Sequence, residues 1–266
     1  MPPQQILRDI CVVLTSNWTI TLLTMYSIPN HKRNALIFAM TLMFCTPISV
    51  VLSVYTYGQV NILFTILWMF LNCWLFTGLF ITAHDCMHNS VSPTNPSLNR
   101  KIGVLALLIY AGLSYDKLLE GHILHHRHVA TKEDPDYLVH QSDKESLLGL
   151  RWYISFLQSY LTWHPFMWMA CWFTLLDRGL GISVPAMITC WLVPQVFSTV
   201  QLFYFGTFLP HKGSFEPNTT LAKSNDYPTW LSLLTCFHFG YHREHHDHPY
   251  APWWYLPTIW TKERSS

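Results

Sequence analysis

The sequence predicts an all-α membrane protein made of two transmembrane helical hairpins, four spans in all, with a polar helical cap on one membrane face. Composition is the first reason: the 266-residue chain is 50% hydrophobic and only 12% charged, about half the charged share of an ordinary soluble domain. The second reason is the mean hydropathy of only +0.20, which means that the apolar residues must be concentrated in blocks. The third reason is that the Lys and Arg residues avoid those blocks.

The four blocks pair into hairpins. Residues 35–56 and 60–83 are uncharged and are separated by a three-residue turn. Residues 152–176 and 182–210 are also uncharged and are joined by a five-residue link. Each block is about 20 residues or longer, which is enough for a helix that crosses a bilayer. Helices are expected because backbone groups in lipid must satisfy one another's hydrogen bonds.

The positive charges predict an orientation for one domain of residues 1–266. If both hairpins enter from the same side, 15 of the 16 Lys and Arg residues lie on that side and only Arg178 lies opposite. Cytoplasmic segments carry the excess of positive charge. Residues 84–151 and 211–266 are therefore predicted to be cytoplasmic parts of a multi-pass integral membrane protein. The net charge of +1 offers no basic field for nucleic acid.

Three segments depart from this plan. Residues 10–30 are uncharged but dotted with polar side chains, which favours an interfacial or partly embedded helix over a full span. Residues 102–114 are apolar but too short to cross, so a re-entrant or shallow segment is expected. A His164–Pro165 pair in the third span predicts a kink there, or a later start of the true span.

Nine histidines form spaced groups, all on the predicted cytoplasmic side. One group is an H-x-x-x-H pair at the end of the second span, and two are H-x-x-H-H boxes placed 120 residues apart. A single histidine ends the fourth span. On a helix these spacings put imidazoles on one face about one turn apart. The nine residues are His84, His88, His122, His125, His126, His211, His242, His245 and His246.

This pattern predicts a dinuclear metal site. Imidazole is a common ligand of first-row transition metals, and about four to six ligands saturate one such ion. Nine histidines are therefore too many for one ion and suit two. No cysteine completes a zinc-type tetrahedron. The all-nitrogen set favours iron, which can activate O2, with copper as the alternative on ligand type alone.

Metal-bound imidazoles usually donate their other ring nitrogen to a carboxylate or a carbonyl. Six residues near the histidine groups are expected to play such supporting roles: Asp85, His128, Asp134, His238, Glu244 and His248. His238 lies one helical turn before His242 and could share its face. Asp136 is explained equally well as a solvated surface charge.

The residues around the histidines resemble one family. Residues 80–88 (FITAHDCMH), 125–136, 201–211 and 237–257 are similar to the β-carotene ketolases of bacteria and cyanobacteria. That family is part of the membrane di-iron superfamily, together with fatty-acid desaturases, alkane hydroxylases and other carotenoid oxygenases. The likeness runs from about residue 60 to residue 258.

The resemblance implies that the nine histidines bind two Fe2+ ions, with His211 as the extra ligand that related hydroxylases place between their second and third boxes. It implies an O2-dependent monooxygenase that hydroxylates ring carbon 4 of β-carotene twice. Loss of water then leaves a ketone, as in echinenone and canthaxanthin. Cys86 and Asn89 stand where the family tends to have Ala and Gly, so they could tune rate or regiochemistry.

The sequence contains no flavin or nicotinamide fingerprint, so electrons are expected from an external ferredoxin-like protein at the cytoplasmic face. The carotenoid is expected to enter from the lipid bilayer. Other enzymes would share the metal site: a carotenoid 3-hydroxylase, or a fatty-acid or alkane desaturase or hydroxylase. A metal transporter is disfavoured because it would need ligands near the midplane of the membrane.

Overall fold

The computed structural model describes residues 28, 30–138, 148–213 and 221–265. Every regular element in these ranges is helical, which confirms the all-α prediction. The predicted interfacial segment 10–30 lies almost wholly outside the described residues.

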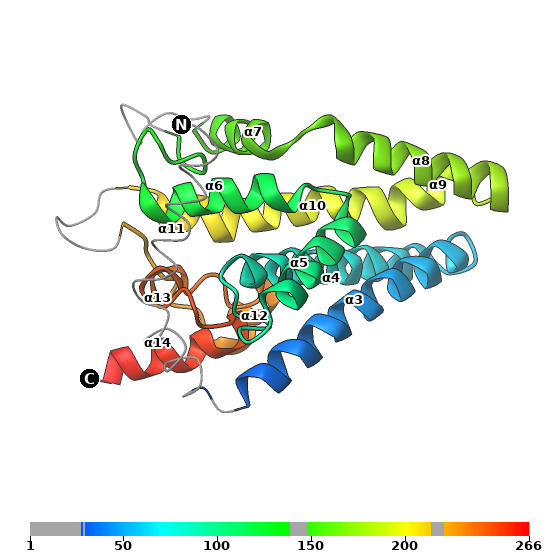
Figure 1. The fold of residues 1–266 in the computed structure, drawn as a ribbon. Helices are drawn as coiled ribbons and strands as arrows, with labels where there is room; N and C mark the ends of the chain where they lie inside the picture. The colour runs from blue at the N-terminus through cyan, green and yellow to red at the C-terminus, as the bar shows by residue number, and fades with distance from the viewer. Residues whose placement is uncertain (1–27, 29, 139–147, 214–220, 266) are drawn as a thin grey trace.

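Three long helical runs are apolar enough to cross a membrane. They are α3 (His31–Thr56), α4 (Ile62–Met87) and the continuous run Val184–His211. The last run consists of α9 (Val184–Met187), η1 (Ile188–Leu192), α10 (Val193–Leu202), η2 (Phe203–Phe208) and α11 (Leu209–His211). The first predicted hairpin and the fourth predicted span are therefore present as apolar helices. In Figure 1 these helices extend away from the same end of the molecule, with α3 inclined to α10.

The predicted third span is not one continuous helix. Residues 152–176 are divided between α7 (Leu148–Tyr160) and α8 (Trp163–Leu180), and α8 is not among the helices that qualify as spans in the described residues. Pro165 explains the break, because it lacks an N–H and its ring clashes with the carbonyl four residues earlier. In the first turn of α8 neither defect matters. Of the two alternatives expected at His164–Pro165, a kink or a later start, the structure shows a helix that ends at Tyr160 and a new helix that begins at Trp163.

The apolar segment 102–114 belongs to a bent pair of helices, α5 (Pro96–Tyr110) and α6 (Tyr115–Arg127). Their axes differ by 108°, the geometry of a re-entrant loop or a broken span. The chain reverses at Gly112, whose φ of +69° favours glycine. Ser114 then caps α6 by accepting a hydrogen bond from the backbone of Lys117. α6 carries the first H-x-x-H-H box back toward the end of α4.

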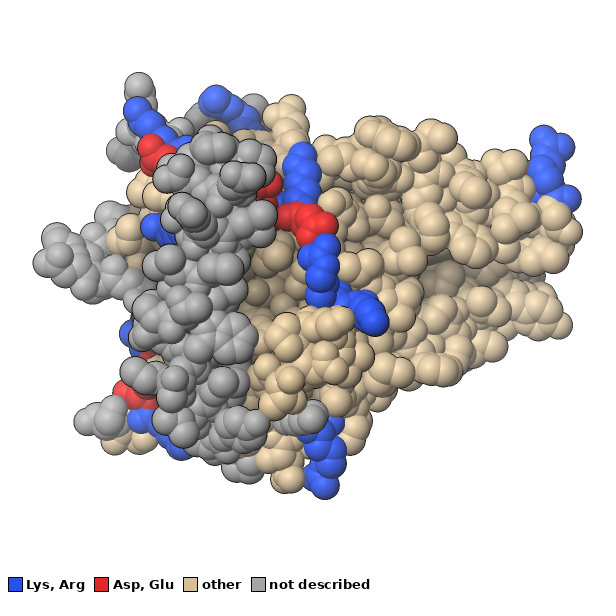
Figure 2. All heavy atoms as spheres, in the orientation of Figure 1, with Lys and Arg blue, Asp and Glu red and all other residues tan. Residues whose placement is uncertain are grey.

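The C-terminal part contributes four short elements: α12 (Thr229–Cys236), α13 (His242–Asp247), η3 (Trp253–Tyr255) and α14 (Leu256–Ser265). In Figure 1 they gather with α6 and α11 at one end of the long helices. Figure 2 shows that the charged side chains occupy this same end, whereas one isolated basic group stands at the far tip, where α8 gives way to α9. The charged residues, which avoid the apolar blocks in the sequence, thus gather toward one end of the folded molecule.

Hydrogen bonds between polar side chains, and the close packing of the C-terminal segment on α4, fix the relative positions of the long helices. The Asn72 side chain on α4 accepts from Ser49 at 2.5 Å and donates to Ser53 at 2.9 Å and to the Cys190 carbonyl at 2.7 Å. It therefore ties α4 to both α3 and η1, as polar side chains do between membrane helices. Nearer the cap, a Cβ at Gly78 would lie 2.6 Å from the Phe237 ring. The missing side chain lets the C-terminal segment pack on α4.

Candidate metal centre

The structure brings all nine histidines together at the charged end of the helices. α4 supplies His84 and ends at His88, α6 supplies the first box, α11 ends at His211, and α13 carries the second box. Their rings pack edge to face: the centroid of His84, for example, lies 4.4 Å from that of His122 and 4.6 Å from that of His245. Spacing in the sequence pointed to eight of these residues, and the position at the end of the fourth predicted span pointed to His211.

The nine side chains divide into two clusters of metal-ligating geometry. Within each cluster, one ring nitrogen per residue lies within 4.8 Å of all the others. The five-histidine cluster consists of His84, His88, His122, His126 and His245, and the four-histidine cluster of His125, His211, His242 and His246. The clusters adjoin, since the rings of His126 and His246 are 4.3 Å apart.

Each H-x-x-H-H box contributes to both clusters. In the α6 box, His122 and His126 belong to the five-histidine cluster and His125 to the other. In the α13 box the outer pair belongs to the four-histidine cluster and His245 crosses over. Positions i and i+4 lie nearly above one another on a helix, whereas i+3 is rotated to the opposite side of that line. The spacing thus places histidines from a single helix in both of the adjoining clusters.

Hydrogen bonds orient two of the imidazoles. His125 Nδ1 lies 3.0 Å from both carboxylate oxygens of Asp134, which also accepts from the backbone of Ala130. His211 Nδ1 donates to the Leu221 carbonyl at 2.9 Å. Each Nδ1 therefore carries the proton, and Nε2 is left with a lone pair aimed into the cluster.

Burial keeps the α13 box neutral. The pKa of His242, His245 and His246 is well below its usual range, first because burial penalises the charged form and then because neighbouring imidazoles repel it. Neutral imidazole is the form that binds metal. The α13 rings are therefore ready to coordinate without losing a proton.

Two predicted supporting carboxylates are buried but have other partners. Asp85 accepts from the Trp253 backbone at 3.0 Å, while His84 Nδ1 is 3.6 Å away, beyond hydrogen-bonding range. Glu244, 1% exposed, accepts from Ser224 and Arg243. These two carboxylates therefore stabilise the backbone segments that carry the histidines and do not orient the imidazole rings directly.

Three predicted supporting histidines lie outside the clusters. His128 ends α6 with an exposed ring, and His248 contacts Glu263 at 2.9 Å. His238 stacks between Tyr241 and Trp253. The expectation that His238 shares the face of His242 is wrong, because His238 adopts a φ of +62° and no helix connects the two residues.

Asp136, for which the sequence left two explanations open, is partly buried against the four-histidine cluster. Its carboxylate lies 4.0 Å from His125 Nδ1 and accepts a hydrogen bond from Tyr160. Burial raises the pKa of Asp136 to about 6. Tyr160 and the Leu221 carbonyl are supporting groups that sequence reasoning missed, because each comes from a different segment and neither belongs to a spaced motif.

The donor set fits bound metal ions. Both ring nitrogens of His84 and Nδ1 of His242 are buried and make no hydrogen bond within the described residues, which is costly unless another partner is supplied. His88 Nε2 lies 2.6 Å from His122 Nε2, and His211 Nε2 lies 3.0 Å from His242 Nε2. Nitrogen lone pairs that face one another at these distances repel, and a bound cation would remove this repulsion.

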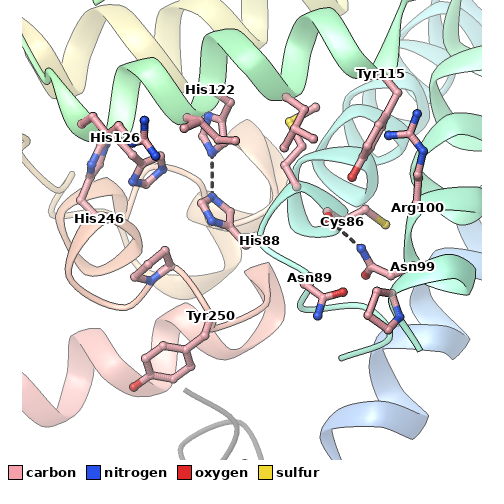
Figure 3. Close-up of a pocket in the computed structure, with 16 residues that line it drawn as sticks. Cys86, His88, Asn89, Asn99, Arg100, Tyr115, His122, His126, His246 and Tyr250 are labelled. Atoms are coloured by element: carbon pink, nitrogen blue, oxygen red, sulfur yellow. Dashed lines mark hydrogen bonds between the residues drawn. The ribbon is translucent and has the colours of Figure 1, made fainter. Parts of the chain in front are cut away.

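Several cavities among the described residues reach the histidines, and two of them lie between the helices. The larger, of about 620 Å³, lies between α4, α5, α6 and the segment after α13. In Figure 3, His88, His122, His126 and His246 stand on one side of it, with Asn89, Asn99, Arg100 and Tyr115 on the other.

The second cavity, here called the inner chamber, is only about 50 Å³ and faces both clusters from the side of the apolar helices. It is lined by His84, His122, His125 and His242 together with apolar side chains that include Phe80, Leu118, Phe156 and Leu202. A small apolar chamber next to two sets of imidazoles suits the chemistry of a hydrocarbon at a metal centre.

Fold and site together define a class: helical membrane proteins that hold two adjoining histidine clusters at one end of their apolar helices. The family model for fatty acid desaturases matches residues 60–265, which include all nine histidines. The chain belongs to the β-carotene ketolases within this fatty acid desaturase family.

Individual relatives support that membership. A β-carotene ketolase of Paracoccus sp. (strain PC1) is 46% identical over 187 residues, which cover 69% of this chain and 74% of the relative. A β-carotene ketolase of Paracoccus sp. (strain N81106 / MBIC 01143) is 42% identical, with 71% of this chain and 76% of the relative covered. A zeaxanthin 4-ketolase of Chlamydomonas reinhardtii is 36% identical, with 69% of this chain but 41% of the relative covered.

Proposed function

We propose that this chain is an O2-dependent di-iron oxygenase that converts the C4 methylene of carotenoid β-ionone rings to a ketone. The observation that carries the proposal is the division of nine histidines into two adjoining clusters in a chain that is 46% and 42% identical to two β-carotene ketolases. The proposed substrate is β-carotene and the products are echinenone and canthaxanthin.

In this proposal the five-histidine cluster holds one iron and the four-histidine cluster the other. First-row ions take about four to six ligands, so each cluster leaves room for a further ligand. Bound iron would supply the activation of O2. Asp134 and the Leu221 carbonyl would hold the rings of His125 and His211 in the tautomer that binds metal.

The inner chamber of about 50 Å³ is smaller than a β-ionone ring, so its apolar walls would have to move apart to admit the ring with C4 toward the histidines, and would then exclude water. Each hydroxylation consumes one O2, two electrons and two protons, and releases one water. A second round at the same carbon gives a gem-diol, which loses water to give the ketone. Side chains such as Phe80 and Leu202 would keep the ring in place between the two rounds.

We propose that residues 1–266 form one domain with four spans, in which α8 pairs with the Val184–His211 run as the second hairpin. The charged end with the histidines would face the cytoplasm, since positive charge gathers there. An electron-donor protein, such as a ferredoxin, would approach that end.

A fatty-acid desaturase or a carotenoid 3-hydroxylase is the alternative. An omega-6 desaturase of Spinacia oleracea is 28% identical over 219 residues, well below the ketolases, which favours the carotenoid. A metal transporter remains disfavoured because the histidines gather at one end of the spans.

Expression in bacteria that make β-carotene, followed by chromatography of the pigments, tests the proposal. Echinenone and canthaxanthin are expected. Unchanged β-carotene from a protein shown to be present and loaded with iron would reject the ketolase function, and zeaxanthin without ketones would establish the hydroxylase.

A further inference from the structure

Another apolar cavity, distinct from the inner chamber, lies among the long helices and away from the histidines. It encloses about 680 Å³ between α3, α5, α8 and η1, and we call it the membrane groove. None of the described residues that line it is charged. Its walls include Val50 and Val54 of α3, Leu108 of α5, Trp168 and Trp172 of α8, and Trp191 of η1.

Along α4, the membrane groove lies farther from the histidine clusters than the inner chamber does. Phe76, which lines it, lies eight residues from His84 on α4, or about 12 Å at 1.5 Å per residue. The Ser49–Asn72 hydrogen bond places Thr46 of α3 near the level of Phe76. From Thr46 to Tyr55 the groove follows α3 for about a further 14 Å. The residue levels from His84 to Tyr55 therefore span roughly 25 Å along the helices, a length that suits a rod-shaped ligand.

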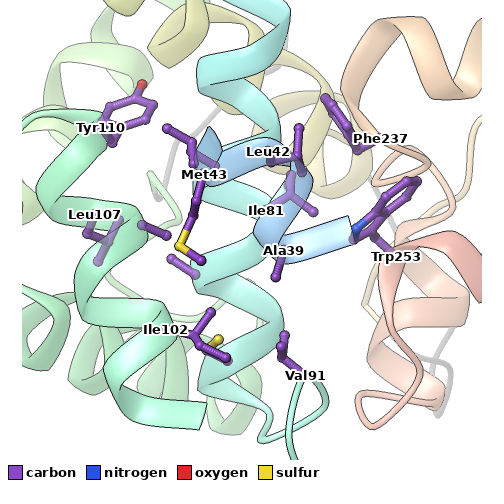
Figure 4. Packing of buried hydrophobic residues seen from close by; sticks show 14 of the residues in the cluster. Ala39, Leu42, Met43, Ile81, Val91, Ile102, Leu107, Tyr110, Phe237 and Trp253 are labelled. Carbon is purple, nitrogen blue, oxygen red and sulfur yellow. The ribbon is translucent and has the colours of Figure 1, made fainter. Parts of the chain in front are cut away.

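One aromatic side chain separates the two cavities. Phe76 lines the groove and Phe80 lines the inner chamber, and both rings pack edge-on against Tyr110, at 5.8 and 5.9 Å. Figure 4 shows the Tyr110 ring extending from the end of α5 beside α4. The Tyr110 hydroxyl donates to Ser198 at 3.2 Å, and its carbonyl accepts from Gln195. Tyr110 is therefore the partition between groove and chamber.

The last long helical run departs from α geometry at both cavities. The π-helical segment η1 carries Trp191 into the wall of the groove, and the π-helical segment η2 carries Gly206 into the wall of the chamber. π-Helical turns cost stability and occur frequently at functional sites. Two such turns, one at each cavity, indicate that the path between them is functional.

We propose that the membrane groove holds the polyene of the carotenoid, and that one end ring enters an enlarged inner chamber when the Tyr110 side chain, which separates the two cavities, turns aside. This inference rests on the proposed function. An uncharged, elongated groove with three indole walls fits a hydrocarbon rod. The lining residues include no charged side chain that would hold a phospholipid head group.

Matched tryptophan substitutions test the groove. Val50→Trp narrows it, whereas Leu52→Trp lies on the same helix, is lipid-exposed, and does not line the groove. In proteoliposomes containing β-carotene, Val50→Trp should raise the apparent KM about tenfold, equivalent to ~1.4 kcal/mol, with kcat nearly unchanged, because binding is lost equally in the ground state and the transition state. Leu52→Trp should behave as wild type. Leu108→Trp and Leu105→Trp form a second pair on α5.

Binding is measured separately from turnover. β-Carotene is achiral, so circular dichroism induced in its visible band by the detergent-solubilised, metal-free protein reports a bound polyene. Val50→Trp and Leu108→Trp should lose this signal, and their controls should keep it. Equal signals and equal KM in each pair would overturn the groove, as would loss of the signal on adding phospholipid alone. A wild type that binds β-carotene but forms no ketone would instead reject the proposed function and leave the groove standing.

Discussion

The two H-x-x-H-H boxes share a spacing but differ in what holds them. The α6 box lies on a 13-residue helix with a Ser114 cap, and Asp134 directly contacts one of its rings. The α13 box lies on a helix of six residues without a side-chain cap. So short a helix is unstable in water by itself. Its shape depends on tertiary bonds, chiefly Glu244 to Ser224.

The difference teaches that the spacing specifies which cluster each ring joins, and the surroundings specify how firmly it is held. In both boxes the outer pair joins one cluster and the i+3 residue joins the other. The α6 box achieves this with local helix stability, and the α13 box with buried polar contacts. The two boxes should therefore fail in different ways when their supports are removed.

Removing the residue that crosses over in each box should have the largest effect. His125→Ala leaves three histidines in its cluster, and His245→Ala leaves four in the other. Both should abolish ketone formation, because both ions are needed, but His125→Ala should lose more iron since fewer ligands remain. Pigment chromatography and iron analysis of the purified protein measure this. Near-normal iron and turnover in either variant would remove that residue from the ligand set.

Asp134→Asn should come next. The carboxylate that holds His125 Nδ1 becomes an amide that accepts a weaker hydrogen bond, and such partners are worth about 10–100-fold in metal affinity or activity. Asp116→Asn is the control, since Asp116 is an exposed α6 carboxylate paired with Arg100. Iron affinity by competition with a chelator should fall only in Asp134→Asn. Equal affinities would mean that Asp134 does not orient the ring.

Much of this site could be predicted from sequence, because spacing on a helix is a local property. The grouping of His84, His88 and the two boxes followed from it. The Pro165 break was also readable, since a proline acts on its own helix. His238 was misjudged because the helix was assumed to extend before His242, whereas Phe237 and His238 both have positive φ.

The supporting contacts were not readable for a different reason. Tyr160 reaches Asp136 from α7, and Trp253 reaches Asp85 from 168 residues away. Such pairs depend on how distant segments pack, and no periodicity records that. The same holds for Tyr110, which acquires its place only where α5 meets α4 and α10.

Glu244→Ala should damage the α13 box through the fold. The change leaves the half-buried Ser224 hydroxyl without its buried acceptor, a loss of about 1–3 kcal/mol. Thermal unfolding should begin at lower temperature and iron should be held less tightly, both together. Asp134→Asn, by contrast, should lower iron affinity with little change in thermal stability. A Glu244→Ala protein with unchanged melting but weak iron would show that Glu244 acts on the metal directly.

Ser114→Ala should have the smallest effect and so probes the stability of the α6 box. The substitution removes the cap that accepts from the Lys117 backbone and costs about 1 kcal/mol. His122 lies two turns into α6, beyond the frayed end, so iron content and KM should match wild type while the melting temperature falls slightly. If Ser114→Ala lowered iron as much as Glu244→Ala does, the α6 box would depend on its ends as the α13 box does, and the contrast between local and tertiary support would be lost.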